Sequence, residues 1–185
     1  MTHVFEPDDL HEIAKLGVGK PNDEAFETII ETLEERYPDH VRPTRRWIFN
    51  NAGGAMGALM LLHASLSEYM ILFGSPIGTS GHSGRYATEV HDFMISGEMW
   101  TYHEGDAEKT IYQPGDAAFL GRSATKGYRL PDGAWMLEYA RGPIPTMLPF
   151  GLLDVFTSTL DARAAGRTLF DYGRLVTGQL LQLKI

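Results

Sequence analysis

The first forty residues show the apolar spacing of two helices. Asp8 or Asp9 can cap a short helix that runs to about Leu16 and ends at Gly17 and Gly19. A second helix is predicted to follow, with acidic residues on one face and apolar residues on the other. Its apolar positions are Phe26, Ile29, Ile30, Leu33 and Tyr37.

A long apolar stretch, residues 47–73, comes next and contains Gly53, Gly54 and Gly57. We interpret it as a buried helix in two parts, in which the glycines allow close approach of neighbouring backbones. Gly53 and Gly57 are four residues apart, a spacing suited to tight helix packing. Packing in the core and contact between subunits are served equally well by this spacing.

Strand and turn signals dominate residues 86–139. The turn sequences SG, EGD, PGD and PDG stand at residues 96–97, 104–106, 114–116 and 131–133. Short strands at this spacing predict a small antiparallel barrel or sandwich. Because no repeat, linker or low-complexity tract interrupts the chain, we expect one domain over residues 1–185.

Helical periodicity returns near the C-terminus, over residues 146–160 and 162–183. In the second segment, arginines at 163, 167 and 174 lie around the side opposite an apolar stripe. Such a helix is typical of a membrane interface. A helix that caps the β-structure explains the pattern equally well. The stripe consists of Leu169, Tyr172, Val176, Leu180 and Leu183.

Composition and charge narrow the possible functions. The 185 residues include no cysteine, which excludes disulfides and thiol chemistry. Residues 1–40 carry eleven acidic and three basic residues, which accounts for the whole net charge of −8, so no nucleic-acid partner is expected. No signal peptide is visible, and polar residues from His63 to Glu68 interrupt the best candidate for a membrane span, residues 52–73.

Glu138 is the first candidate for chemistry. It is the only charged residue between Ala134 and Ala140. In a strand, Trp135, Leu137 and Tyr139 would face one way and Met136 and Glu138 the other, and neither face is polar enough for water. A buried carboxyl group must pair, shift its pKa or become neutral. The alternative is a structural glutamate satisfied by Arg141 or by a backbone amide.

Asp92 is the second candidate, in the apolar strand sequence of residues 90–95. Two carboxyl groups that lie close together cannot both ionise cheaply, so such a pair can donate and accept protons, or hold a ligand's cation. An aspartate facing the solvent at a strand edge fits the local sequence equally well.

The histidines do not indicate a metal site. His82, His91 and His103 lie in or beside the predicted β-structure, but the chain has no His-x-His sequence. The glycine-rich loop of residues 78–85 has no phosphate-binding spacing. We therefore expect no cofactor and no metal.

Three longer blocks carry a family resemblance. They read WIFNNAGGAMGALMLLHASLSEYMILFG at residues 47–74, PIGTSGHSGRY at 76–86 and WMLEYARGPIPTMLPFGLLDVFTSTLD at 135–161. These blocks resemble the family that unites the fungal Δ8–Δ7 sterol isomerase and the sigma-1 receptor. NNAGGAMG and PTMLPFGLLDVFTSTLD are similar to the isomerase branch, whereas GHSGRY and WMLEYARG are similar to the receptor branch.

The resemblance implies an α+β fold. A cupin-like antiparallel β-barrel would enclose a ligand cavity, flanked by N-terminal helices and by two amphipathic C-terminal helices that face a membrane. Glu138 would pair with the amine of a ligand, and Asp92 would lie beside it. The resemblance further implies that the cavity is lined by Tyr69, Phe73, Tyr86, Ile144, Leu148 and Tyr172.

The resemblance also implies a homo-oligomer, favouring a trimer, with its contact in the Gly53–Gly57 stretch. Ala55 stands where the receptor branch has tryptophan and the isomerase branch a small residue. The family's N-terminal transmembrane anchor would end about where this chain begins. We therefore expect a peripheral membrane protein on the cytoplasmic side.

Two functions are consistent with these residues. The first is a sterol Δ8–Δ7 isomerase in which Glu138 and Asp92 exchange protons with the substrate, a tertiary carbocation forming between the two proton transfers. The second is a non-catalytic binder of cationic amphiphiles or lipids, since a protonated amine imitates that carbocation. A structural adaptor on the membrane surface, without a cavity, would leave Glu138 unexplained.

Overall fold

The computed structural model describes residues 3–182. Two helices, α1 (Pro7–Lys15) and α2 (Asn22–Arg36), precede the strands, as the spacing predicted. The cap predicted at Asp8 or Asp9 is wrong, because both residues lie in the first turn of α1, after its N-cap Glu6. The strands of this part of the chain are β1 (Ile48–Ala52), β2 (Ala55–Ala64), β3 (Glu68–Ser75), β4 (Thr79–His82), β5 (Glu89–Ser96), β6 (Met99–Tyr102), β7 (Thr110–Tyr112), β8 (Ala117–Leu120), β9 (Gly127–Leu130) and β10 (Ala134–Arg141).

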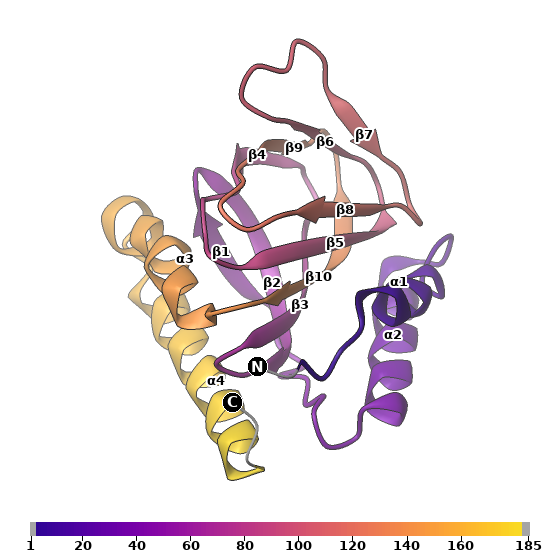
Figure 1. Ribbon diagram of the computed structural model, residues 1–185, viewed down its shortest axis with the longest axis vertical. Coiled ribbons are helices and arrows are strands. Elements are labelled where there is room, and N and C mark those ends of the chain that lie inside the picture. The colour runs from indigo at the N-terminus through magenta and orange to yellow at the C-terminus, as the bar shows by residue number, and fades with distance from the viewer. Residues whose placement is uncertain (1–2, 183–185) are drawn as a thin grey trace.

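The strands form two antiparallel sheets. The larger has the order β1-β2-β3-β10-β5-β8 and the smaller the order β4-β9-β6-β7. Helices α1 and α2 lie on one side of the strands, and the C-terminal helices lie on the opposite side (Figure 1). The predicted α+β, cupin-like fold is confirmed, although the two sheets are not joined into one closed barrel.

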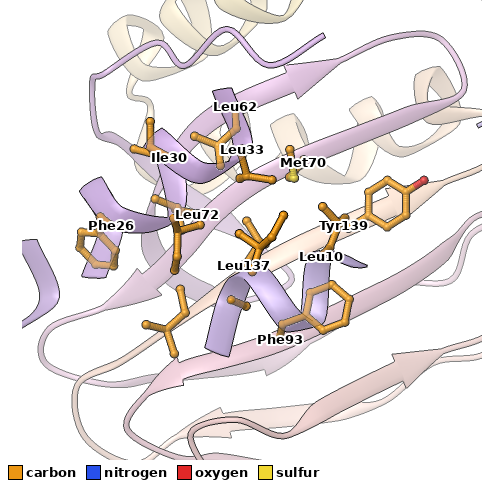
Figure 2. Close-up of a cluster of buried hydrophobic side chains, with 14 of the residues drawn as sticks. Leu10, Phe26, Ile30, Leu33, Leu62, Met70, Leu72, Phe93, Leu137 and Tyr139 are labelled. Carbon is orange, nitrogen blue, oxygen red and sulfur yellow. The ribbon is translucent and has the colours of Figure 1, made fainter. Parts of the chain in front are cut away.

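One face of the larger sheet packs against α1 and α2. Figure 2 shows side chains from these helices interleaved with side chains from the central strands. Fully burying an apolar side chain of this size contributes roughly 1.5–3 kcal/mol, so this cluster is the main core of the N-terminal side. Its labelled members are Leu10, Phe26, Ile30, Leu33, Leu62, Met70, Leu72, Phe93, Leu137 and Tyr139.

The opposite face of the same sheet follows from strand alternation. In β10, Trp135, Leu137 and Tyr139 belong to the cluster under the helices, whereas Met136 belongs to a second cluster on the other face. Glu138 points to the same face as Met136, as the sequence predicted. Apolar side chains on both faces explain why β10 reads as an almost continuous apolar run.

The prediction of a helix over residues 47–73 is wrong. This stretch forms β1, β2 and β3, paired in antiparallel register. Gly53 and Gly54 form the β1–β2 turn with φ angles of +61° and +83°, and Gly57 lies within β2. The apolar run resembled a buried helix because β2 and β3 are buried on both faces, which removes the alternation that marks a half-exposed strand.

The C-terminal segment is helical, as predicted, but is divided into more pieces. A 3₁₀ turn (Ile144–Met147) leads into α3 (Leu148–Asp154) and a π-helical turn (Val155–Thr159). Helix α4 (Ala162–Leu181) then starts at Asp161, whose Oδ1 accepts a 2.9 Å hydrogen bond from the Ala164 amide. None of the helices in the described range is long and apolar enough to cross a membrane.

The apolar stripe predicted along α4 is split between its two sides. Val176 is buried and Tyr172 half-buried against the β-structure, whereas Leu169 and Leu180 are exposed; Leu183 lies outside the described residues. The prediction failed because α4 also buries polar residues. Asp171 forms an ion pair with Arg46, and Gln179 Oε1 lies 2.8 Å from His40 Nδ1. These partners come from distant parts of the chain.

The β1–β2 turn provides a test of this architecture. A Cβ at Gly53 would lie 2.2 Å from the His82 carbonyl oxygen, whereas a Cβ at Gly54 would meet nothing within 4 Å. Both positions have left-handed backbone angles, which cost a residue with a side chain about 1–2 kcal/mol. We therefore expect Gly54→Ala to lower the unfolding free energy by about that amount and Gly53→Ala to lower it clearly more. Equal losses in chemical denaturation would contradict the close approach of His82.

Candidate ligand cavity with paired carboxyl groups

A cavity of about 200 Å³ lies between the inner face of the larger sheet, the smaller sheet and the C-terminal helices. Its walls are mostly apolar and aromatic. All eight residues that the sequence proposed for the site line it. They are Tyr69, Phe73, Tyr86, Asp92, Glu138, Ile144, Leu148 and Tyr172.

The two carboxyl groups are brought together by sheet register. Glu138 in β10 is directly opposite Asp92 in β5. Side chains at opposite positions of an antiparallel pair point to the same face, with Cβ atoms about 4.5–5.5 Å apart. The sequence placed each residue in an apolar strand, but only the pairing of β10 with β5 makes them neighbours.

Near neutral pH, the carboxyl group of Glu138 is close to the balance between its protonated and its ionised form. The Tyr69 hydroxyl donates a hydrogen bond to Glu138 Oε1. The pKa of Glu138 is raised to about 7, first by burial and then by the Asp92 charge, against the opposing effects of Tyr69 and Lys126. The proposed pairing with Arg141 is wrong, because Arg141 Nε lies 2.8 Å from Glu89 Oε2. Glu138 can therefore gain or lose a proton near neutral pH.

Asp92 has a partner that the sequence did not reveal. It is only 4% exposed, so the alternative of an aspartate facing the solvent is wrong. Lys126 Nζ lies 2.7 Å from Asp92 Oδ2, and Lys126 is itself only 6% exposed. Lys126 was missed because it follows the loop Arg122–Thr125 and looks like an ordinary surface lysine. Nothing in its local sequence signals that the smaller sheet turns its side chain inward.

Aromatic rings surround the carboxyl groups. Tyr86 and Tyr128 line the cavity, and the pKa of each is raised, first by burial and then by the Glu138 charge. Tyr86 also packs edge-on against Phe150 of α3, with ring centroids 5.3 Å apart. A Cβ at Gly84 would lie 1.8 Å from the Tyr86 hydroxyl, so only glycine allows this tyrosine to take its place. Tyr128 was not predicted as a lining residue.

The C-terminal helices complete the cavity. Leu148 and Phe150 from α3, with Thr168 and Tyr172 from α4, form part of the wall. The Tyr172 hydroxyl donates to the Ser65 carbonyl oxygen at 3.3 Å, a contact between α4 and the β2–β3 turn. Residues more than one hundred positions apart therefore meet across the cavity.

The three histidines in or beside the β-structure make contacts other than metal ligation. His82 Nδ1 accepts a 2.9 Å hydrogen bond from the Gly84 amide, and His103 Nδ1 lies 2.8 Å from the Thr125 carbonyl oxygen. His91 packs among aromatic rings, with Phe119 at a centroid distance of 4.9 Å. Within residues 3–182, no three His, Asp or Glu side chains are grouped as metal ligands.

The fold and this cavity define a protein whose two β-sheets and C-terminal helices surround an apolar, aromatic-walled cavity that contains a pair of carboxyl groups. Over residues 1–184, the chain matches the family described as "ERG2 and Sigma1 receptor like protein". The chain belongs to this family, as the sequence motifs indicated.

The relatives include both branches of the family. The chain is 39% identical to the C-8 sterol isomerase of Neurospora crassa over 98% of its own length and 73% of the relative. It is 40% identical to the Sigma non-opioid intracellular receptor 1 of Danio rerio over 97% of its own length and 81% of the relative. A "Protein erg2 homolog" of Dictyostelium discoideum is 44% identical over 93% of this chain and 74% of the relative.

Solved cupin structures show a partial likeness. An RmlC-like cupin from Shewanella frigidimarina covers 54% of this chain and 86% of its own, with 16% identity and a TM-score of 0.44. A cupin superfamily protein from Desulfitobacterium hafniense covers 45% of this chain and 74% of its own, with 18% identity and a TM-score of 0.40. These likenesses say nothing about what the cavity binds.

The pKa of Glu138 leads to a prediction about stability. A glutamate whose pKa is raised on folding makes the folded state bind its proton more tightly, so stability falls as pH rises from the ordinary value towards about 7. Glu138→Gln removes this loss. We expect its unfolding temperature to exceed that of the wild type by about 2–4 °C or more at pH 8, with a smaller difference at pH 5.

Glu89→Gln is the matched control. Its hydrogen bond with Arg141 lowers the pKa of Glu89, so this carboxylate stabilises the fold above its ordinary pKa, and the same substitution should not raise the unfolding temperature at pH 8. A Glu138→Gln variant that is less stable than the wild type at both pH values would contradict the buried, partly neutral state of Glu138.

Proposed function

We propose that this protein is a sterol Δ8–Δ7 isomerase-like protein whose cavity binds sterols and hydrophobic cationic amines. The observation that carries the proposal is the placement of Glu138 opposite Asp92 in an otherwise apolar, aromatic-lined cavity. Membership of a family that includes sterol isomerases and sigma receptors supports it.

The Δ8–Δ7 isomerisation requires groups of the kind that this cavity contains. Addition of a proton to C9 of the Δ8 double bond leaves a tertiary cation at C8, and loss of a proton from C7 forms the Δ7 double bond. A carboxyl group with a pKa near 7 can take part in either transfer. Carboxylate charge and the faces of Tyr69, Tyr86 and Tyr128 stabilise the cation between the two steps.

A receptor-like binder without catalysis is the second candidate. The same features favour it, since ionised Glu138 offers one carboxylate to a ligand ammonium, and the surrounding rings accommodate its alkyl groups. Both functions use the same residues. They differ in whether a bound Δ8-sterol is converted.

Contact with a membrane surface is part of the proposal. Large apolar side chains are exposed along the C-terminal segment from α3 to α4, and Arg163 and Arg174 are exposed on α4. An apolar face with basic neighbours is typical of helices that lie in a membrane interface. The exposed apolar residues are Leu153, Phe156, Leu160, Leu169, Phe170, Leu180 and Leu181.

We also propose homo-oligomer formation through the β1–β2 hairpin, Ile48–Ala64. Strand β1 is an edge strand of the larger sheet, and the hairpin exposes Phe49 and Met56. An edge strand with exposed apolar side chains is suited to contact with another chain. The number of subunits stays a prediction.

Conversion of a Δ8-sterol tests the function directly. We expect the purified protein, incubated with a Δ8-sterol in deuterium oxide, to form Δ7-sterol with deuterium at C9, detected by mass spectrometry. Glu138→Gln should lower turnover by about 10²-fold or more because it removes a group that transfers protons. It should also weaken binding of a hydrophobic amine by more than about tenfold, or about 1.4 kcal/mol.

Glu89→Gln, a matched change outside the cavity lining, should retain both properties. Amine binding that depends on Glu138, without any conversion of the sterol, would favour the receptor-like function. Undiminished turnover and amine affinity in a folded Glu138→Gln variant would remove Glu138 from the site.

Flotation with liposomes tests the membrane surface. Phe170 and Leu181 are 67% and 82% exposed on α4. We expect the wild type to float with anionic liposomes and Phe170→Ser/Leu181→Ser to stay in the soluble fraction at an unchanged unfolding temperature. Ile77→Ser, which changes a residue 80% exposed in the β3–β4 turn, is the control and should float like the wild type. A wild type that remains wholly soluble would contradict the membrane surface.

A further inference from the structure

Lys126 connects the two sheets through a buried ion pair. It directly precedes β9 of the smaller sheet, and its Nζ atom reaches Asp92 Oδ2 of the larger sheet at 2.7 Å. Both side chains are only 6% exposed. The Lys126 backbone is held on both sides by Ser83, whose Oγ accepts from the Lys126 amide and whose amide donates to the Lys126 carbonyl, each at 2.9 Å.

This ion pair changes the charge balance of the cavity. A buried charge is tolerated only with a close partner, and removing one member leaves the other uncompensated. The charges of Lys126 and Asp92 cancel, which leaves Glu138 as the carboxyl group without a cation of its own. Both members of the pair shift the pKa of Glu138, because Asp92 raises it and Lys126 lowers it.

The other titratable groups that line the cavity around Glu138 are four tyrosines and one histidine. Tyr69, Tyr86 and Tyr128 face it from β3, from the segment before β5 and from β9, and the pKa of each is raised. Tyr172 of α4 and His82 of β4 line the same cavity. His82 is engaged with the Gly84 amide and the Thr125 hydroxyl.

We propose that Lys126 is a positioning residue that holds Asp92 as a fixed anion, so that the cavity offers one available carboxylate, Glu138, and selects ligands with a single cationic centre. This inference rests on the proposed function and extends it to the role of each carboxyl group. Asp92 then acts as a charge, and Glu138 carries the exchangeable proton. A second cationic centre placed at Asp92 would meet the ammonium of Lys126.

The test uses decyltrimethylammonium, a cation whose charge is independent of pH, with binding measured by calorimetry between pH 5.5 and pH 9. Wild-type affinity should rise as pH increases through about 7, because Glu138 ionises there. In Lys126→Met, Asp92 and Glu138 share one proton over a range of pH, so the cavity stays negative at lower pH. We expect tighter binding by about threefold or more and a pH midpoint that moves down by about one unit.

Three further variants separate this role from a structural one. Lys126→Arg keeps the charge and should retain the wild-type pH midpoint. Asp92→Asn leaves an unpaired ammonium and should weaken binding by more than about tenfold. Asp92→Asn/Lys126→Met removes both charges and should restore affinity to within about threefold of the wild type, which a direct contact between Asp92 and the ligand would prevent.

Decanol, an uncharged ligand of similar length, is the control and should bind all folded variants alike. Weaker cation binding in Lys126→Met with an unchanged pH midpoint, or no recovery in the double variant, would overturn the role of Lys126. If Lys126→Met fails to fold, the comparison between Asp92→Asn and the double variant decides. Absence of cation binding in the wild type, or equal binding in Glu138→Gln, would instead overturn the proposed ligand site.

Discussion

The two-sided burial of the central strands is the constraint on which this structure depends. Strand β10 has a neighbour on each edge, packs under α1 and α2 with one face and lines the cavity with the other. Because side chains alternate along a strand, a shift of register by one residue would exchange Glu138 with Leu137 or Tyr139. The hydrophobic core therefore fixes which residues face the cavity, and the site inherits its geometry from the core.

The cavity holds three ionisable groups where an ionised group is unfavourable in free energy. Glu138, Asp92 and Lys126 lie among apolar and aromatic side chains, in surroundings that disfavour ionised groups. The structure compensates two of these charges with a direct ion pair and the third with the Tyr69 hydroxyl. This arrangement is less favourable to folding than an apolar core would be. Its value lies in a carboxyl group that can change its charge near neutral pH.

The C-terminal helices belong to the site as much as to the surface. Helix α4 is attached to the segment between α2 and β1 through Asp171 with Arg46 and Gln179 with His40, and to the β-structure through apolar contacts. These polar attachments occupy its inner side, so three leucines and Phe170 remain exposed on the outside. One helix thus closes the cavity with Tyr172 and offers an apolar surface with Phe170.

Much of the fold and part of the site could be predicted from the sequence. Helices α1, α2 and α4, the strand-rich middle and the inward direction of Glu138 follow from local spacing, because each depends on residues a few positions apart. The helix predicted over residues 47–73 is wrong. Because its strands are buried on both faces, their sequence lacks the alternation that distinguishes a strand from a helix. The resemblance identified the family. It also indicated cavity residues that could not be recognised from their local sequence alone.

Only the tertiary structure decided which side chains meet. The pairing of Glu138 with Asp92 depends on the register of β10 and β5, and the approach of Lys126 depends on how the smaller sheet faces the larger one. Contacts of this kind join residues 34 and more positions apart, and no local pattern encodes them. The sequence by itself determined the kinds of groups available and most of the elements, apart from the strands within residues 47–73. The packing of the two sheets determined the charges of the ionisable groups in the cavity, because burial and proximity set the free energy of an ionised group.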